Sequence, residues 1–325
     1  MKRRQLTAAA VLAASLPLFL PATGHAQAFP SKPVRIVVPF GAGGVADLTA
    51  RVVAQKLGEG LRQSVIVDNK PGAGGIVAGE AVAKAAPDGH TLLLMSNGTA
   101  VSAGLFKSLP FDAQKDFAPV ATLGFFDLAL ISAANGRFQS LPEMLAYAKA
   151  NPGKLNVATI NIGSTQHLTA ELLKTSAGVD FQVVPFNGSP AVLTALRGGQ
   201  VDAAIEILGP MMGQIASKTV RPLAVMGAKR APGLPEVPTV RESGVGGFNV
   251  ASWNALAAPA NTPPEVIALL NREIGKALAS PELRKQLAEL NVTPAGGPPE
   301  QLRELLASEI KRWSDVIVRA NVPRQ

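Results

Sequence analysis

The chain has 325 residues, a formal net charge of +8 and no cysteine. The lack of cysteine excludes disulfides, thiol nucleophiles and cysteine-ligated metal centres. The lysines and arginines are dispersed along the chain, whereas a nucleic-acid interface needs clustered basic charge, so we expect no nucleic-acid partner. With only three histidines, we also expect no metal site. Mild basicity fits attraction of anionic solutes, and the length allows two domains.

Residues 1–28 show the three parts of a secretory signal peptide. Lys2-Arg3-Arg4 is a basic start, Leu6–Leu20 is apolar, and Ala26-Gln27-Ala28 is an A-x-A cleavage site. The apolar run is too short to favour a membrane anchor. The paired arginines leave Sec and twin-arginine export both open. We expect cleavage near Ala28 and a periplasmic protein of about 297 residues.

The first half of the remaining chain alternates strand-like and helix-like patterns. The strands are expected over Val34–Val38, Val65–Val67 and Thr91–Leu94, and the helices over Val45–Leu57 and Ile76–Ala86. Such alternation is typical of an α/β fold with parallel sheets.

A second set of alternating elements follows Ala134-Asn135-Gly136. Ser140 and Glu143 resemble a capping box at a helix start, and Gly178 is suited to end a helix over Thr165–Ala177. The other elements expected in this half are strands over 155–159, 181–184, 203–207 and 221–226 and a helix over 190–197.

The C-terminal stretch is helical in pattern. Proline-led helix starts follow Thr262 and Ser280, and a last helix has an apolar face over Leu302–Ile317. We expect two lobes joined by crossings near residues 125–135 and 245–255, with the C-terminal helices covering the first lobe. The expected lobe 1 is 29–128 and 250–325, and lobe 2 is 129–249. A ligand cleft would lie between them, faced by strand ends and helix N-termini.

The most informative segment is Pro39–Asp47, a glycine turn between a strand and a helix. The first N–H groups of a helix lack partners within it and carry the positive end of its dipole, and glycine lets an anion approach them closely. The segment therefore predicts an anion-binding loop, with a purely structural tight turn as the alternative. Its candidate ligand-binding residues are Phe40, Gly41, Ala42, Gly43, Gly44 and Asp47.

The same segment permits an enzymatic reading. Gly41–Ala46 fits the dinucleotide fingerprint G-x-G-x-x-A, and Asp68 ends the next strand where a ribose-binding acid would stand. Export argues against a nicotinamide-dependent oxidoreductase, as does the bulky Pro39-Phe40 pair before the glycines. We expect no enzyme and no cofactor, because no catalytic motif stands elsewhere in the chain.

Small polar residues follow several other strands, where hydrogen bonds to a ligand in the crevice are favoured. These candidates are Ser96, Asn97, Gly163, Ser164, Thr165, Asn187 and Ser189. Ser164 or Thr165 can instead be a helix N-cap. The turn Asn69–Gly75 either is structural or has a rim or hinge role.

Two titratable residues complete the candidate set. His167 is too close in sequence to Ser164 for good base geometry, so local capping competes with ligand binding. Glu206 ends the strand 203–207, where it can bind a ligand hydroxyl or amine, or can be a surface or ion-paired residue.

These residues resemble those of the Bug-type solute-binding receptors of tripartite tricarboxylate transport systems, over essentially all of the mature chain. The matching stretches are Phe29–Ile36, Pro39–Asp47, Asn69–Gly75, Ala86–Thr91, Leu109–Asp112, Lys115–Phe117, His167-Leu168, Gly198–Asp202 and Pro235–Glu242. His90 stands where the family usually has tyrosine.

The resemblance implies a two-lobed periplasmic-binding-protein type II (Venus-flytrap) fold that closes over a small carboxylate. Its partners would be membrane permease subunits, and the protein would be a monomer. A sensor that reports to a membrane signalling partner would have the same cleft and is the alternative. Glu206 replaces the family's usual aspartate, and Asn187 stands where lysine is common, so the ligand stays open between di- or tricarboxylates, aromatic acids and acidic amino acids.

Overall fold

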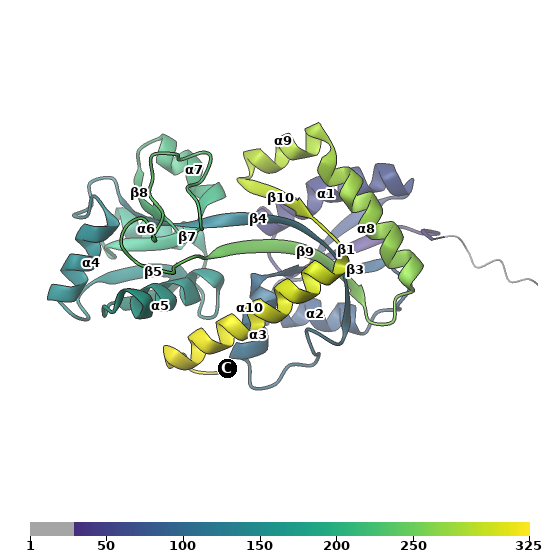
Figure 1. The fold of residues 1–325 in the computed structure, drawn as a ribbon, viewed down its shortest axis with the longest axis horizontal. Coiled ribbons are helices and arrows are strands. Elements are labelled where there is room, and N and C mark those ends of the chain that lie inside the picture. The colour runs from purple at the N-terminus through teal and green to yellow at the C-terminus, as the bar shows by residue number, and fades with distance from the viewer. Residues whose placement is uncertain (1–28) are drawn as a thin grey trace, which may run out of the picture.

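The structure, a computed structural model, describes residues 29–325 and shows two mixed α/β lobes side by side (Figure 1). The expected signal peptide lies outside the described residues. No helix in the described range combines the length and the apolar character needed to cross a membrane.

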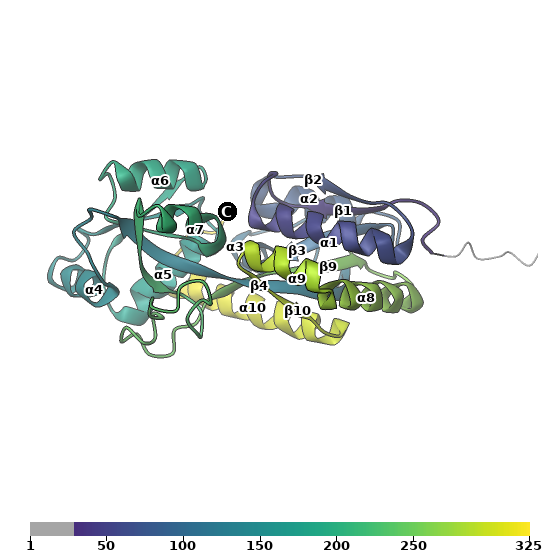
Figure 2. The same cartoon turned by 90° about the horizontal axis from the view of Figure 1, so that it is seen from above.

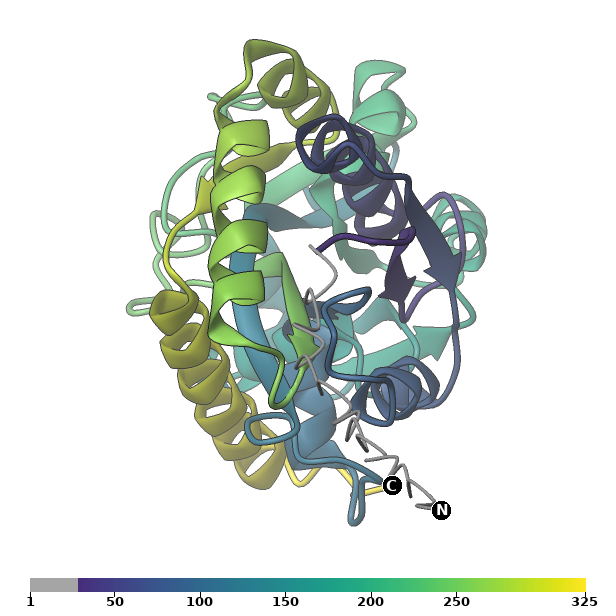
Figure 3. The same ribbon diagram turned by 90° about the vertical axis from the view of Figure 1, so that its right-hand side faces the viewer.

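The first lobe is built on a sheet in which the first three strands are parallel and the other pairs of neighbours are antiparallel. The strand order is β2 (Val65–Asn69), β1 (Val34–Val38), β3 (Thr91–Ser96), β9 (Ala251–Pro259), β4 (Phe117–Ala133) and β10 (Val292–Gly296). Its helices are α1 (Val45–Leu61), α2 (Ile76–Ala83), α3 (Asn97–Leu105), α8 (Pro264–Ala279), α9 (Pro281–Glu289) and α10 (Pro299–Arg319), with a short 3-10 turn at Ala73–Gly75. Figure 3 views this lobe end-on, with α8 in the foreground.

The second lobe repeats the parallel strand and helix arrangement. Its sheet contains β6 (Gln182–Phe186), β5 (Asn156–Ile160) and β7 (Ala203–Ile207), with β8 (Val220–Val225) antiparallel to β4. Its helices are α4 (Leu141–Ala150), α5 (Thr165–Ala177), α6 (Ser189–Arg197) and α7 (Leu208–Ala216).

One long strand belongs to both sheets. β4 pairs with β9 through Asp127 and with β7 and β8 from Leu128 onward, and Figures 1 and 2 both show it running from one lobe into the other. The expected crossings near residues 125–135 and 245–255 fall on β4 and at the start of β9. The lobe boundaries at 128/129 and 249/250 stay a prediction.

The C-terminal helix contacts both lobes. α10 lies against α3 of the first lobe and also against α5 of the second, so it covers more than the first lobe. Trp313 of α10 is fully buried in an apolar cluster that includes Leu105 of α3 and Leu168 of α5. This shared core couples the lobes on one face of the two sheets.

Five helices and strands were not expected from the sequence: α3, α7, β4, β9 and β10. α3 contains Gly98 and Gly104, and α7 contains two glycines and Pro210, all of which lower intrinsic helix propensity. β10 includes Pro294, a residue usually depleted in strands. Tertiary packing decides these elements. The expected helix over 76–86 ends earlier, at Ala83.

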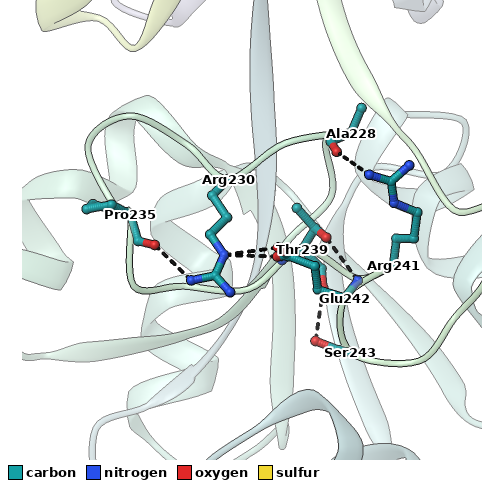
Figure 4. Close-up of polar contacts among 7 residues, drawn as sticks. All are labelled: Ala228, Arg230, Pro235, Thr239, Arg241, Glu242 and Ser243. Carbon is teal, nitrogen blue, oxygen red and sulfur yellow. Dashed lines mark hydrogen bonds and ion pairs between the residues drawn. The ribbon is translucent and has the colours of Figure 1, made fainter.

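The long connection from β8 to β9 is stabilised by hydrogen bonds among its own residues (Figure 4). Arg230 donates from Nε to both carboxylate oxygens of Glu242, at 3.3 and 3.0 Å. Thr239 accepts from the Glu242 amide and donates its own amide back to that carboxylate. Bonds from the Thr239 backbone and from Arg230 lower the pKa of Glu242.

Candidate functional site

The glycine loop between β1 and α1 leaves space beside its backbone. Gly43 has φ +86°, and a Cβ added at Gly41, Gly43 or Gly44 would meet no atom within 4 Å. Gly44 is the N-cap of α1, and no side chain caps that helix start. Residues 41–44 are exposed. The first amides of α1 are therefore available to an anion.

Asp47 shapes this loop, and its carboxylate has little capacity left for a ligand. Oδ2 accepts from the Gly43 amide at 2.8 Å and from Arg51 Nε at 3.0 Å. Oδ1 accepts from Asn69 Nδ2 at 2.9 Å and pairs with Arg51 at 2.9 Å. Burial alone would raise the pKa of Asp47, but these bonds outweigh it and hold the pKa below its usual value.

Asn69 is a positioning residue that the sequence did not single out. Its Nδ2 donates to the Phe40 carbonyl at 3.0 Å as well as to Asp47, while its Oδ1 accepts from Arg51 at 3.0 Å. Asn69 thus ties the end of β2 to the loop after β1. The available signal was its place in the Asn69–Gly75 stretch that resembles the receptor family.

Ser96 and Asn97 begin a helix rather than a loop. Ser96 is the N-cap of α3 and accepts from the Gly98 amide at 3.1 Å. Asn97 is fully buried. Its Nδ2 donates to Thr165 Oγ1 of the second lobe at 3.3 Å, and its Oδ1 accepts from Trp313 Nε1 at 2.7 Å. Asn97 therefore joins the two lobes and α10.

Ser164 is the N-cap of α5, which decides between the two residues considered for that role. Its Oγ accepts from the His167 amide at 3.0 Å and donates to the Ile160 carbonyl at 2.8 Å. His167 is nearly buried, and its Nδ1 has no partner among the described residues. Burial lowers the pKa of His167. The Ser164 hydroxyl is thus engaged with backbone and not with the imidazole.

Glu206 is buried at the carboxyl end of β7, with 1% of its surface exposed. Ser189 Oγ donates to its Oε2 at 2.8 Å, and Oε1 has no hydrogen-bond partner within the described range. Burial raises the pKa of Glu206 to about 7, although the Ser189 hydroxyl and the nearby Gln166 side chain and Ile207 backbone oppose the rise. The surface interpretation of Glu206 is therefore wrong. Asn187, on the neighbouring turn, is exposed.

Helix starts from both lobes meet here. Asn97 opens α3 and bonds Thr165, the first residue of α5. A Cβ on Gly209, in the first turn of α7, would lie 3.6 Å from Val45, the first residue of α1. The starts of α3 and α5 therefore meet, as do those of α1 and α7, and the positive end of a helix dipole favours negative charge nearby.

The structure also bears on two other kinds of site, a dinucleotide site and a metal site. Asp68, the acid required by a dinucleotide site, has its carboxylate 3.6 Å from Arg35 and 3.7 Å from Lys70. Over residues 29–325, no group of three histidine, aspartate or glutamate side chains is arranged to hold a metal ion.

Comparison with known proteins identifies the family. Residues 49–322 match the tripartite tricarboxylate transporter family receptor. A UPF0065 protein from the tcbD-tcbE intergenic region of Pseudomonas sp. (strain P51) is 40% identical over 90% of this chain and 87% of its own length. Protein BugT of Bordetella pertussis is 37% identical over 90% of each chain.

Solved structures agree in fold. The periplasmic binding protein BugD is 32% identical with a TM-score of 0.81, covering 91% of this chain and all of that one. Rpa4515 of R. palustris with adipate is 34% identical with a TM-score of 0.83, covering 90% of this chain and 98% of that one. MatC of Rhodopseudomonas palustris with bound malate is 35% identical with a TM-score of 0.79, covering 89% of this chain and all of that one. The chain therefore belongs to the receptor family of tripartite tricarboxylate transporters and has the two-lobed periplasmic-binding-protein fold.

Proposed function

We propose that this protein is a periplasmic, non-enzymatic receptor that captures a small carboxylated metabolite between its lobes and delivers it to membrane permease subunits. The observation that carries the proposal is the meeting of helix starts from both lobes, α3 with α5 and α1 with α7, of which α1 and α7 have no side-chain cap. The similar structures with adipate and malate support a carboxylate as the ligand class.

Main-chain amides are suited to this task. A carboxylate at a helix N-terminus gains charge-assisted hydrogen bonds without an arginine having to be desolvated. Each helix end contributes about 0.3–1 kcal/mol when exposed and up to about 2 kcal/mol when partly buried. A ligand that touches both lobes would favour their closed arrangement over the open one.

The candidate residues divide into contacts and supports. The proposed contacts in the first lobe are the residues of the glycine loop, Phe40–Gly44, together with Ser96. Those of the second lobe are Gly163, Ser164, Thr165, His167, Asn187, Ser189 and Glu206. Asp47 and Asn97, whose side chains are engaged within the protein, are proposed to position the contacts. We further propose that the receptor acts as a monomer.

Thermal unfolding of protein stripped of retained ligand tests the proposal. The panel comprises adipate, malate, tricarboxylates, aromatic acids and acidic amino acids, with an uncharged amide of matched size as control. At a concentration one hundred times its Kd, a ligand adds about 2.7 kcal/mol of stability, which raises the Tm of a protein of this size by roughly 4 °C. Stabilisation by no acid in the panel would contradict the proposal.

A further inference from the structure

Glu206 is the buried acid that the fold leaves incompletely bonded. Its Oε2 accepts the Ser189 hydroxyl, while Oε1 faces no hydrogen-bond partner among the described residues. No lysine, arginine or histidine of residues 29–325 lies within 4 Å of its carboxylate to form an ion pair with it. Leaving a buried polar atom without a partner costs about 1–3 kcal/mol, so a ligand group is the natural partner for Oε1.

The elements around Glu206 carry few other titratable groups. α5 carries His167, Glu171 and Lys174, and β4 carries Asp127; burial lowers the pKa of His167 and raises the pKa of Asp127 and of Glu171. α6 carries only Arg197, at its far end, β8 carries Arg221, and β5 and α7 carry none. Asp127 and Glu171 are therefore the other acids that a pH-dependent measurement has to separate from Glu206.

We propose that Glu206 holds the second carboxylate of a dicarboxylate ligand through a shared proton, its Oε1–H donating to a ligand oxygen. This inference rests on the proposed function and names the ligand class: an acid with carboxylates at both ends. The first carboxylate lies at the glycine loop and the second at Glu206, close to the starts of α6 and α7.

The bonding pattern favours this arrangement over an ion pair with a ligand amine. The Ser189 hydroxyl donates to Oε2, which leaves Oε1 to carry the proton of a neutral carboxyl. A carboxylate is the strong acceptor for such a proton, and O–H···O⁻ bonds are among the stronger hydrogen bonds in proteins. The neighbouring helix starts stabilise the ligand's negative charge. Burial, which raises the pKa of Glu206 to about 7, keeps the acid neutral at lower pH.

The arrangement couples ligand binding to uptake of one proton from solvent. Below pH 7, Glu206 is already protonated, and affinity for the dianion is insensitive to pH. Above pH 7, the proton must be taken up on binding, so the Kd rises about tenfold per pH unit. An ammonium or hydroxyl ligand bound to a charged Glu206 has the opposite dependence, because its affinity improves as the acid ionises.

The test is calorimetric titration of wild-type protein and Glu206→Gln with adipate and malate at pH 6, 7, 8 and 9. Hexanoate serves as the one-carboxylate counterpart of adipate. We expect the wild-type Kd for the dicarboxylate to rise about tenfold from pH 8 to 9, with close to one proton absorbed per ligand in paired buffers of different ionisation enthalpy. Glutamine has a permanent N–H donor, so Glu206→Gln should bind with a Kd that is flat from pH 7 to 9.

Glu171→Gln and Asp127→Asn are the matched controls, because each removes another acid whose pKa burial raises, and both should keep the wild-type pH profile. A wild-type Kd that is flat or falls between pH 7 and 9 overturns the inference. Binding of hexanoate without binding of either dicarboxylate also overturns the inference. That result would still agree with the proposed function. Binding of no acid at any pH overturns the proposed function itself.

Discussion

Gly43 and Gly44 stand side by side in the loop but for different reasons. Gly43 has φ +86°, a conformation that favours glycine, whereas Gly44 has φ −80° and ψ 165°, which any residue adopts. Neither position has an atom near its missing Cβ. The first glycine thus serves the backbone conformation, and both keep the space next to α1 clear.

These two positions give a matched pair of substitutions. Gly43→Ala should cost about 1–2 kcal/mol of stability because of its left-handed conformation, while Gly44→Ala should leave stability unchanged or slightly raised. Gly44→Ala should nevertheless weaken carboxylate binding at least about tenfold, or 1.4 kcal/mol, since its methyl group occupies the ligand's approach. Urea unfolding and calorimetric titration measure the two effects. Unchanged affinity in Gly44→Ala would show that the ligand does not approach this backbone.

The burial of Glu206 also predicts how the stability of the ligand-free protein depends on pH. Its folded pKa of about 7 exceeds the ordinary value of 4.5, so its contribution to stability is present below pH 4.5 and is lost as the pH rises to 7. Glu206→Gln does not titrate and should gain on the order of 1–3 kcal/mol relative to wild type between pH 5 and pH 8. Urea unfolding of both proteins at these two pH values measures the gain. A difference that does not change with pH would contradict the buried, uncompensated acid.

Helices and strands were predictable where their signals are local. Ser164 and Gly178 mark the two ends of α5 in the sequence, and the structure confirms Ser164 as N-cap and Gly178 as the left-handed C-cap. α7 lacked such signals because of its Pro210 and its glycines. The partners of Asn97 could not be predicted either, since Trp313 lies 216 positions away and only folding brings the two together.

The junction of α3, α5 and α10 depends on Asn97. Asn97→Ala removes both of its bonds and should lower the free energy of unfolding by about 1–3 kcal/mol. Thr165→Val removes only the bond between the lobes and should cost less, about 0.5–1.5 kcal/mol. Trp313 keeps its bond to Glu309 in both variants. Urea unfolding compares them, and a larger loss in Thr165→Val than in Asn97→Ala would refute the assigned role of Asn97.

The two lobes contact each other through Asn97 and Thr165 and also through α7. The missing side chain of Gly209 lets α7 approach the Leu290 carbonyl between α9 and β10. A Cβ there would overlap that carbonyl. Sequence patterns within either lobe do not reveal this contact, because it depends on how the lobes come together.

Two glycines of α7 separate closure from helix stability. Gly209→Ala should hinder closure and weaken carboxylate binding, whereas Gly213→Ala has nothing within 4 Å of its added Cβ and should bind normally. Both changes raise helix propensity, by roughly 0.5–1 kcal/mol. Small-angle scattering with and without ligand should show compaction in Gly213→Ala and less of it in Gly209→Ala. Equal compaction and equal affinity would exclude this contact from closure.

The central claim is that helix starts from two lobes clamp a carboxylate. Calorimetric titration of stripped wild-type protein at pH 7, with the acid that stabilises it most in thermal unfolding, tests it most directly. The account predicts saturable binding of one ligand per chain, weakened by Gly44→Ala in the first lobe and by Gly209→Ala at the contact between lobes. Binding that neither substitution changes, or no binding of any organic acid, would contradict it.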